Sequence, residues 1–212
     1  MPKVILNKCN VNISGVWNVG IFSPAWLKTE LPEVFSAKEI EIGAAIGPEI
    51  QLRFTSNEIV VVPSSRKLVI GLLVYSSENL DKIQLLATKI FEKLPHTPIT
   101  AIGNNLDFEL EENESFASEF NPNPRPEEIE FSKHTFPGMT LGAKINQYVL
   151  SMEKGVLNLK TTQSTEARRV EFNFHYEIRN KTMIVDALSS FKSSIELAGR
   201  LKEKIIVMGD KK

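Results

Sequence analysis

Residues 13–18 read ISGVWN and residues 99–104 read ITAIGN, which is the first of four similarities between the two halves of the chain. Residues 42–46 (IGAAI) match residues 141–145 (LGAKI) in the same order. The other two matches are Leu68, Ile70, Leu72 and Val74 with Val170, Phe172, Phe174 and Tyr176, and residues 80–94 with residues 191–205. Four matches in one order predict an internal repeat and therefore two similar halves.

Each half has the pattern strand, helix, several strands and long helix. In the first half, a strand over 11–22 precedes a short helix that begins at Ser23 and Pro24, where proline fits the first turn. Apolar alternation and turn residues then predict strands near 37–47, 49–55, 58–62 and 67–76, and a helix over 78–94 with Ser77 as its N-cap. The second half predicts strands near 97–110, 139–153, 155–162 and 168–179, and one helix over 182–207.

The predicted fold class is α+β: two pseudo-repeated halves forming one curved antiparallel sheet, with the long helices packed on one face. The halves are residues 1–95 and 96–212, which we expect to share one compact unit. This layout resembles the tandem fold of the TATA-box-binding protein and the helix-grip fold, a resemblance of architecture that carries no function with it. An acidic, proline-rich insertion at 111–138 interrupts the second half, and Phe116, Phe120 and Phe131 are expected to anchor it.

The composition excludes several classes of protein. A net charge of -1 gives no general attraction to nucleic acid or to acidic membranes, so we expect no membrane partner. The apolar run near the first residues is too short for a secretory signal, and one cysteine, Cys9, fits a reducing compartment. We therefore expect a cytoplasmic protein.

No motif for catalysis, phosphate binding, a cofactor or a metal occurs in the chain, so we expect no cofactor and no metal. The weak catalytic candidates are His175, Glu177 and Glu171, because strand alternation puts them on one face of a strand, where they could move a proton. An ordinary hydrated sheet face explains the same three residues.

The face of the sheet away from the helices carries the sharper signal. A sheet covered by helices on one face is normally polar on the other, and the second half follows this rule. The first half breaks it with five apolar residues that we predict to be a binding surface: Ile59, Val61, Val69, Leu73 and Tyr75.

Three occupants could cover these residues: segments of the same chain, a protein partner or second copy, or an apolar ligand. We expect a non-catalytic protein-binding or assembly subunit. The alternatives are a small-molecule-binding protein or enzyme with a site on the same face, and a nucleic-acid-binding module. The last is disfavoured because Glu171 and Glu177 on that face would repel phosphates.

Overall fold

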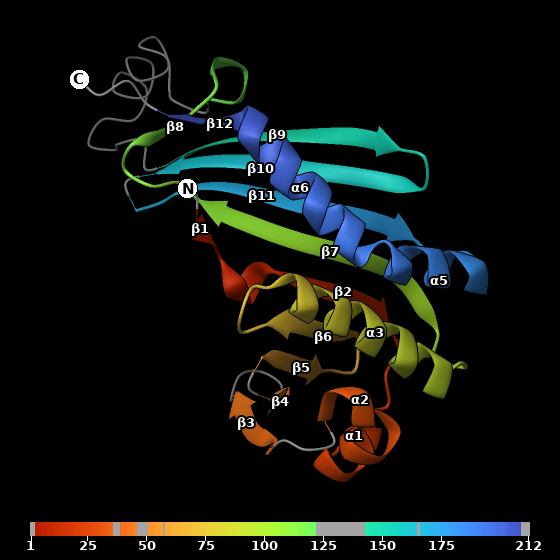
Figure 1. Ribbon diagram of the computed structural model, residues 1–212. Helices are drawn as coiled ribbons and strands as arrows, with labels where there is room; N and C mark the ends of the chain where they lie inside the picture. Colours follow the sequence, from red (N-terminus) through yellow and green to blue (C-terminus); the bar gives the residue numbers. More distant parts are fainter. Residues whose placement is uncertain are drawn as a thin grey trace, which may run out of the picture.

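The computed structural model describes residues 3–35, 39–45, 51–56, 58–121, 143–164 and 166–208. These residues form an α+β fold, in which one large antiparallel sheet is combined with five α-helices (Figure 1). The α+β class and the large antiparallel sheet are therefore confirmed.

The sheet has the strand order β3-β4-β5-β6-β2-β7-β11-β10-β9, and a short β1 also pairs with β7. Strands that lie before residue 95 form one block, strands that lie after it form the other, and β2 meets β7 between them. The bounds are β1 (Lys3–Val4), β2 (Asn10–Gly15), β3 (Glu41–Ala45), β4 (Gln51–Thr55), β5 (Ile59–Pro63), β6 (Lys67–Leu72), β7 (Ile99–Glu109), β9 (Ala143–Met152), β10 (Gly155–Ser164) and β11 (Arg168–Glu177). The order of the strands along the chain agrees with the sequence prediction.

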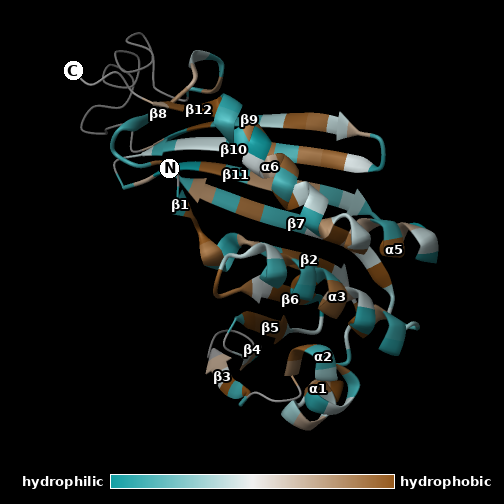
Figure 2. Ribbon diagram, viewed as in Figure 1, coloured by the Kyte–Doolittle hydropathy of each residue, from teal (hydrophilic) through white to brown (hydrophobic). Residues whose placement is uncertain are grey.

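Alternation of apolar and polar residues explains why these segments are strands. In β11, Val170, Phe172 and Phe174 are buried, while the residues between them are half-buried. Successive side chains of a strand point to opposite faces, so one face of the sheet carries the core. The hydropathy colours show the same alternation along the strands (Figure 2).

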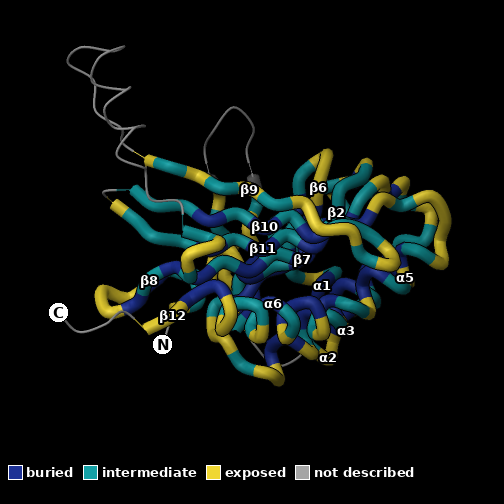
Figure 3. Tube along the Cα trace, turned by 90° about the horizontal axis from the view of Figure 1, so that it is seen from above, coloured by how far each residue is buried: buried dark blue, intermediate teal, exposed yellow. Residues whose placement is uncertain are grey.

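The long helices α3 (Ser77–Lys93) and α6 (Phe191–Ile205) lie on the same face of the sheet, as Figure 3 shows. Each buries an apolar stripe against the strands, and the core between the helices and the sheet includes ten fully or almost fully buried residues: Ile70, Leu72, Ile83, Leu86, Ile90, Phe172, Phe174, Leu188, Phe191 and Ile195. The N-cap of α3 is Ser76 and not Ser77, because the Ser76 hydroxyl accepts from the Asn79 N–H at 3.1 Å.

The predicted single helix over 182–207 is wrong. The structure divides it into α5 (Lys181–Ser189) and α6, with Ser190 at the break, and residues after Ile205 form the short strand β12 (Ile206–Met208). The Ser190 hydroxyl donates to the Ala187 carbonyl oxygen at 2.8 Å, and such local side-chain bonds compete with the helical pattern. Two short helices, α1 (Pro24–Glu30) and α2 (Pro32–Phe35), and two 3-10 turns, η1 (Leu6–Lys8) and η2 (Val19–Ile21), complete the first block.

The beginning of the acidic insertion packs on the body. Its strand β8 (Glu114–Phe116) pairs with β12, and η3 (Ser118–Phe120) follows. Phe116 is buried, and the Phe120 ring packs edge-on against Tyr148 at 5.5 Å. These two phenylalanines anchor the segment as predicted, whereas Phe131 and the rest of the insertion lie outside the described residues.

Candidate functional site

The face of the sheet that points away from α3 and α6, here called the open face, carries four asparagines in a row across its centre. They are direct cross-strand partners in neighbouring strands: Asn10, Asn105, Asn173 and Asn158. We call this set the amide row. It crosses the junction of β2 and β7 and so links the two blocks of strands.

The amide row is a directed chain of hydrogen bonds. The Nδ2 group of Asn158 donates to Asn173 Oδ1 at 3.1 Å, and Asn173 Nδ2 donates to Asn105 Oδ1 at 2.6 Å. Asn105 Nδ2 donates in turn to Asn10 Oδ1 at 2.9 Å, and Asn10 Nδ2 reaches the Asn7 carbonyl oxygen at 3.4 Å. Mutual bonding fixes the orientation of each amide, since all four donate in the same direction along the row.

The amide row lines a cavity of about 410 Å³ on the open face. An asparagine side chain has two N–H donors and an oxygen with two lone pairs, and the row uses only part of this capacity at Asn158 and Asn173. Further polar groups line the same cavity, among them Asn12, Gln147 and Lys160. The cavity can therefore bind hydroxyl, amide or backbone groups through oriented donors and acceptors.

Two carboxylates face each other beside the amide row. Asp107 and Glu171 are cross-strand partners, and Glu171 forms an ion pair with Lys160 at 2.8 Å. Burial, and secondarily the negative charge of Glu171, raise the pKa of Asp107 from 3.8 to about 6. Three cations, Lys8, Lys160 and Arg169, oppose this shift. Asp107 is therefore the carboxyl of this cavity that changes charge in mildly acidic solution.

The raised pKa of Asp107 predicts a pH-dependent stability. Between about pH 4 and pH 6 the folded protein holds a proton at Asp107 that the unfolded chain has lost, so this group makes folding less favourable as the pH rises through that range. We expect Asp107→Asn to remove this loss and to be more stable than wild type at pH 7. Urea denaturation of both proteins from pH 4 to pH 7 measures the difference, and a constant difference across the range would contradict the assignment.

The weak catalytic candidates lie on the open face but do not form one cluster. Glu171 lines the cavity and faces Asp107, whereas His175 lies opposite Gly103 and Val156. Glu177 is exposed and pairs with Arg179 at 3.2 Å. In the part of the chain that the structure describes, no three His, Cys, Asp or Glu residues are grouped to hold a metal ion.

The predicted binding residues do not share one face. Ile59 pairs with Leu72 and Val61 pairs with Ile70, so both are buried in the core beneath the helices, and their placement on the open face is wrong. The prediction placed this strand one residue out of register, and a slip of one residue moves every side chain to the other face.

The other three predicted binding residues also differ among themselves. Val69 is half-buried on the open face. Leu73 follows the end of β6, although its N–H still donates to the Glu58 carbonyl oxygen at 2.8 Å. Tyr75 has left the sheet and is 43 % exposed.

The apolar character of the open face nevertheless remains, carried by different residues. Val62 is the cross-strand partner of Val69, and Val60 lies two residues before Val62 on the same face. All three are half-buried. We call Val60, Val62 and Val69 the valine patch. It lies next to the polar centre, because Asn12 pairs with Val69.

The amide row is the part of the candidate site that sequence reasoning missed. Polar residues at alternate positions of β7, namely Asn105, Asp107 and Glu109, could have pointed to it. Alternation alone, however, does not say which residues of separate strands lie opposite each other, and the row exists only through the registers of three ladders.

The arginines and lysines of the second block are largely used within the fold. The Arg168 guanidinium donates to the carbonyl oxygens of Glu111 and Glu114, and Lys202 lies 5.2 Å from the centre of the Phe108 ring. The described helices include none that is long and apolar enough to cross a membrane. In comparisons with known proteins, no family model and no curated protein matches the chain.

Proposed function

We propose that this chain is a non-catalytic binding protein that docks a protein partner on the open face of its sheet. The observation that carries the proposal is the valine patch, an apolar group on the face that the two long helices leave uncovered. A helix-covered antiparallel sheet normally has a polar outer face, so apolar side chains at these positions favour an interface.

The partner that fits this face best is a second copy of the chain. A two-fold axis running across the strands would place valine patch on valine patch and amide row on amide row, which makes the contact self-complementary. The charged groups near the centre are already compensated in part, since Lys160 neutralises Glu171. Desolvation of this centre therefore costs less than burial of free charges would.

We also infer that the two blocks of strands are copies of one unit, arranged as in the tandem fold of the TATA-box-binding protein. The strand order supports this inference. Outward from the centre, the first block runs β2, β6, β5, β4, β3 and the second runs β7, β11, β10, β9, so in each block the first strand of the chain is central and the others follow in reverse order. If Leu68 corresponds to Val170, the ladders make Ile13 the counterpart of Phe108 and not of Ile99. The same registers make Val62 the counterpart of Lys160 and Val69 the counterpart of Glu171. One copy is thus apolar where the other carries an ion pair.

The docking proposal is tested by Val62→Glu. A carboxylate inside the interface would be buried without a partner, so we expect self-association to weaken more than about 100-fold while the fold remains intact. Sedimentation velocity over a concentration series measures the association, and circular dichroism confirms the fold. Leu85→Glu is the matched control, because Leu85 is exposed on α3, on the other side of the molecule.

Two results would overturn self-association through this face. One is a wild-type chain that stays monomeric at its highest soluble concentration, and the other is a folded Val62→Glu protein that associates as wild type does.

A further inference from the structure

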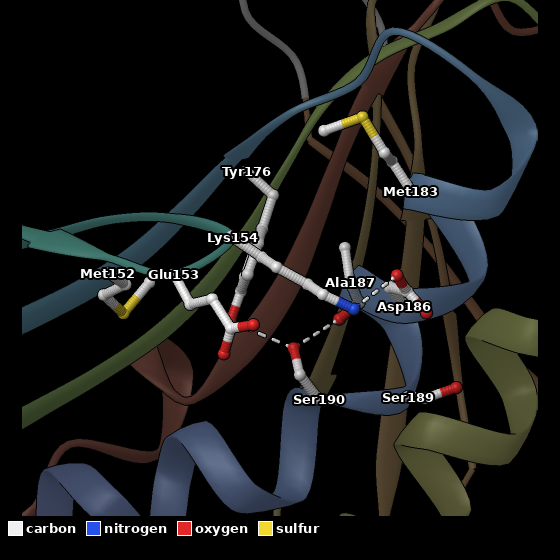
Figure 4. Close-up of a pocket in the computed structure, with 9 residues that line it drawn as sticks. All are labelled: Met152, Glu153, Lys154, Tyr176, Met183, Asp186, Ala187, Ser189 and Ser190. Carbon is white, nitrogen blue, oxygen red and sulfur yellow. Dashed lines mark hydrogen bonds and ion pairs between the residues drawn. The ribbon is translucent and has the colours of Figure 1, made fainter.

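A second cavity, of about 580 Å³, lies at the end of the sheet beside α5, away from the valine patch (Figure 4). Its walls come from the turn between β9 and β10, the end of β11, and the break between α5 and α6. This volume is in the range of small-molecule sites, which are mostly apolar with a few placed polar groups. Met152, Met183 and Ala187 supply the apolar surface, and methionine side chains adapt readily to a bound molecule.

The break between α5 and α6 puts hydroxyl groups at the floor of this cavity. Ser190 lines the cavity, and its hydroxyl is 3.0 Å from the Tyr176 hydroxyl and 2.8 Å from the Ala187 carbonyl oxygen. Ser190 and Tyr176 each have one hydroxyl proton and an oxygen that accepts, so the floor presents groups that can donate to or accept from a bound polar group. If α5 and α6 were one continuous helix, the bond from the Ser190 hydroxyl to the Ala187 carbonyl oxygen would compete with the backbone hydrogen bonds of that helix.

A buried polar cluster supports the floor from behind. Tyr176 lies 3.2 Å from the Ser194 hydroxyl, and Asn104 Nδ2 donates to Ser194 at 3.3 Å and to Ser190 at 3.4 Å. Asn104 is fully buried, and its Oδ1 atom has no hydrogen-bond partner among the described residues. An unsatisfied buried acceptor is costly, and this one lies behind the floor, where Asn104 contacts Ser190.

The rim of the cavity is negatively charged. Lys154 binds Asp186 at 2.9 Å, and Glu153 also lines the rim, where its negative charge acts on Lys154 as well. Two carboxylates against one ammonium leave an excess of one negative charge. The tight turn holds this rim close to Tyr176, because Gly155 has a φ of 157° and packs against the His175 carbonyl oxygen.

From this geometry we propose that the cavity binds a small organic molecule with an apolar, preferably aromatic, body and a protonated amine. The body lies between the two methionines and the Tyr176 ring, and a polar atom at its far end reaches the hydroxyl floor. The amine is held at the rim by Asp186 and Glu153. Such a ligand satisfies both the apolar walls and the charge excess of the rim.

The probe is 2-(4-hydroxyphenyl)ethylamine, and its matched carboxylate is 3-(4-hydroxyphenyl)propionate, which has a similar body and the opposite charge. Titration calorimetry of the full chain at pH 7 should show the amine binding at least about tenfold more tightly, as expected for one added charge interaction. Equal binding of the two probes, tighter binding of the carboxylate, or no binding of the amine would overturn the proposal.

Three variants locate the site. Lys154→Gln should strengthen amine binding severalfold, because it frees Asp186, and Lys154 is exposed enough that its loss leaves the fold intact. Asp186→Asn should weaken amine binding about tenfold. Met183→Trp should fill the cavity and abolish binding, whereas Val185→Trp, two residues along α5 and exposed, should bind as wild type. Weaker amine binding by Lys154→Gln, or unchanged binding by Asp186→Asn, would contradict the assigned rim even if Met183→Trp failed to fold.

Discussion

Replacing Phe174 by alanine is expected to lower the free energy of unfolding by about 3–5 kcal/mol, the usual cost of removing a buried phenylalanine. Phe174 is 1 % exposed and belongs to the core between the sheet and the helices. It lies opposite Leu157 and Asn104 on the neighbouring strands, so its removal leaves a hole in the middle of the sheet face. Urea denaturation followed by circular dichroism measures the loss.

His175→Ala is the matched control for Phe174→Ala. His175 is the next residue of β11 and lies on the open face, so we expect its replacement to change the free energy of unfolding by less than about 0.5 kcal/mol. A loss below roughly 1 kcal/mol for Phe174→Ala would mean that the two faces of β11 have been assigned the wrong way round.

Gly155→Ala is expected to be strongly destabilising. The φ of 157° is rare for residues with a side chain, and an added Cβ would lie 2.5 Å from the His175 carbonyl oxygen, which is backbone and cannot turn away. Backbone strain alone costs about 1–3 kcal/mol, and displacement of the turn from β11 adds to it. Thermal or urea denaturation measures the total.

Gly199→Ala is the control and should have the opposite sign. Gly199 lies inside α6, and an added Cβ would meet no atom within 4 Å. Alanine restricts the unfolded chain and favours the helix, so we expect a gain of roughly 0.5–1 kcal/mol. Similar effects at both positions would show that the Gly155 turn is not constrained as described.

Much of the fold could be predicted from local patterns in the sequence. Alternation placed every strand of the large sheet except the two-residue β1, and apolar spacing placed α3 and its core residues. The errors arose where a single bond or a single residue decides the outcome. Ser76, not Ser77, caps α3, because the Ser76 hydroxyl accepts from the Asn79 N–H. The apolar spacing continues from α5 into α6 and so predicts one helix, but the chain breaks at Ser190, whose hydroxyl bonds to the Ala187 carbonyl oxygen.

The candidate site was less predictable, because it depends on which strands are neighbours. From the sequence, Ile59 and Val61 could lie on either face of the sheet. Only their pairing with Leu72 and Ile70 shows that they are in the core. Asp107 has no unusual local sequence, and its raised pKa comes from burial and from Glu171 on another strand. Such features follow from register, which periodicity does not specify.

The meeting of β2 and β7 bears on how this chain avoids aggregation. Two separate sheets would present four strand edges able to pair with other chains, and joining them through this ladder leaves two among the described strands, β3 and β9. The edge at β3 is short, whereas β9 is ten residues long and exposes Ile145, Val149 and Leu150. Uncontrolled strand addition to this protein is therefore a hazard concentrated on β9.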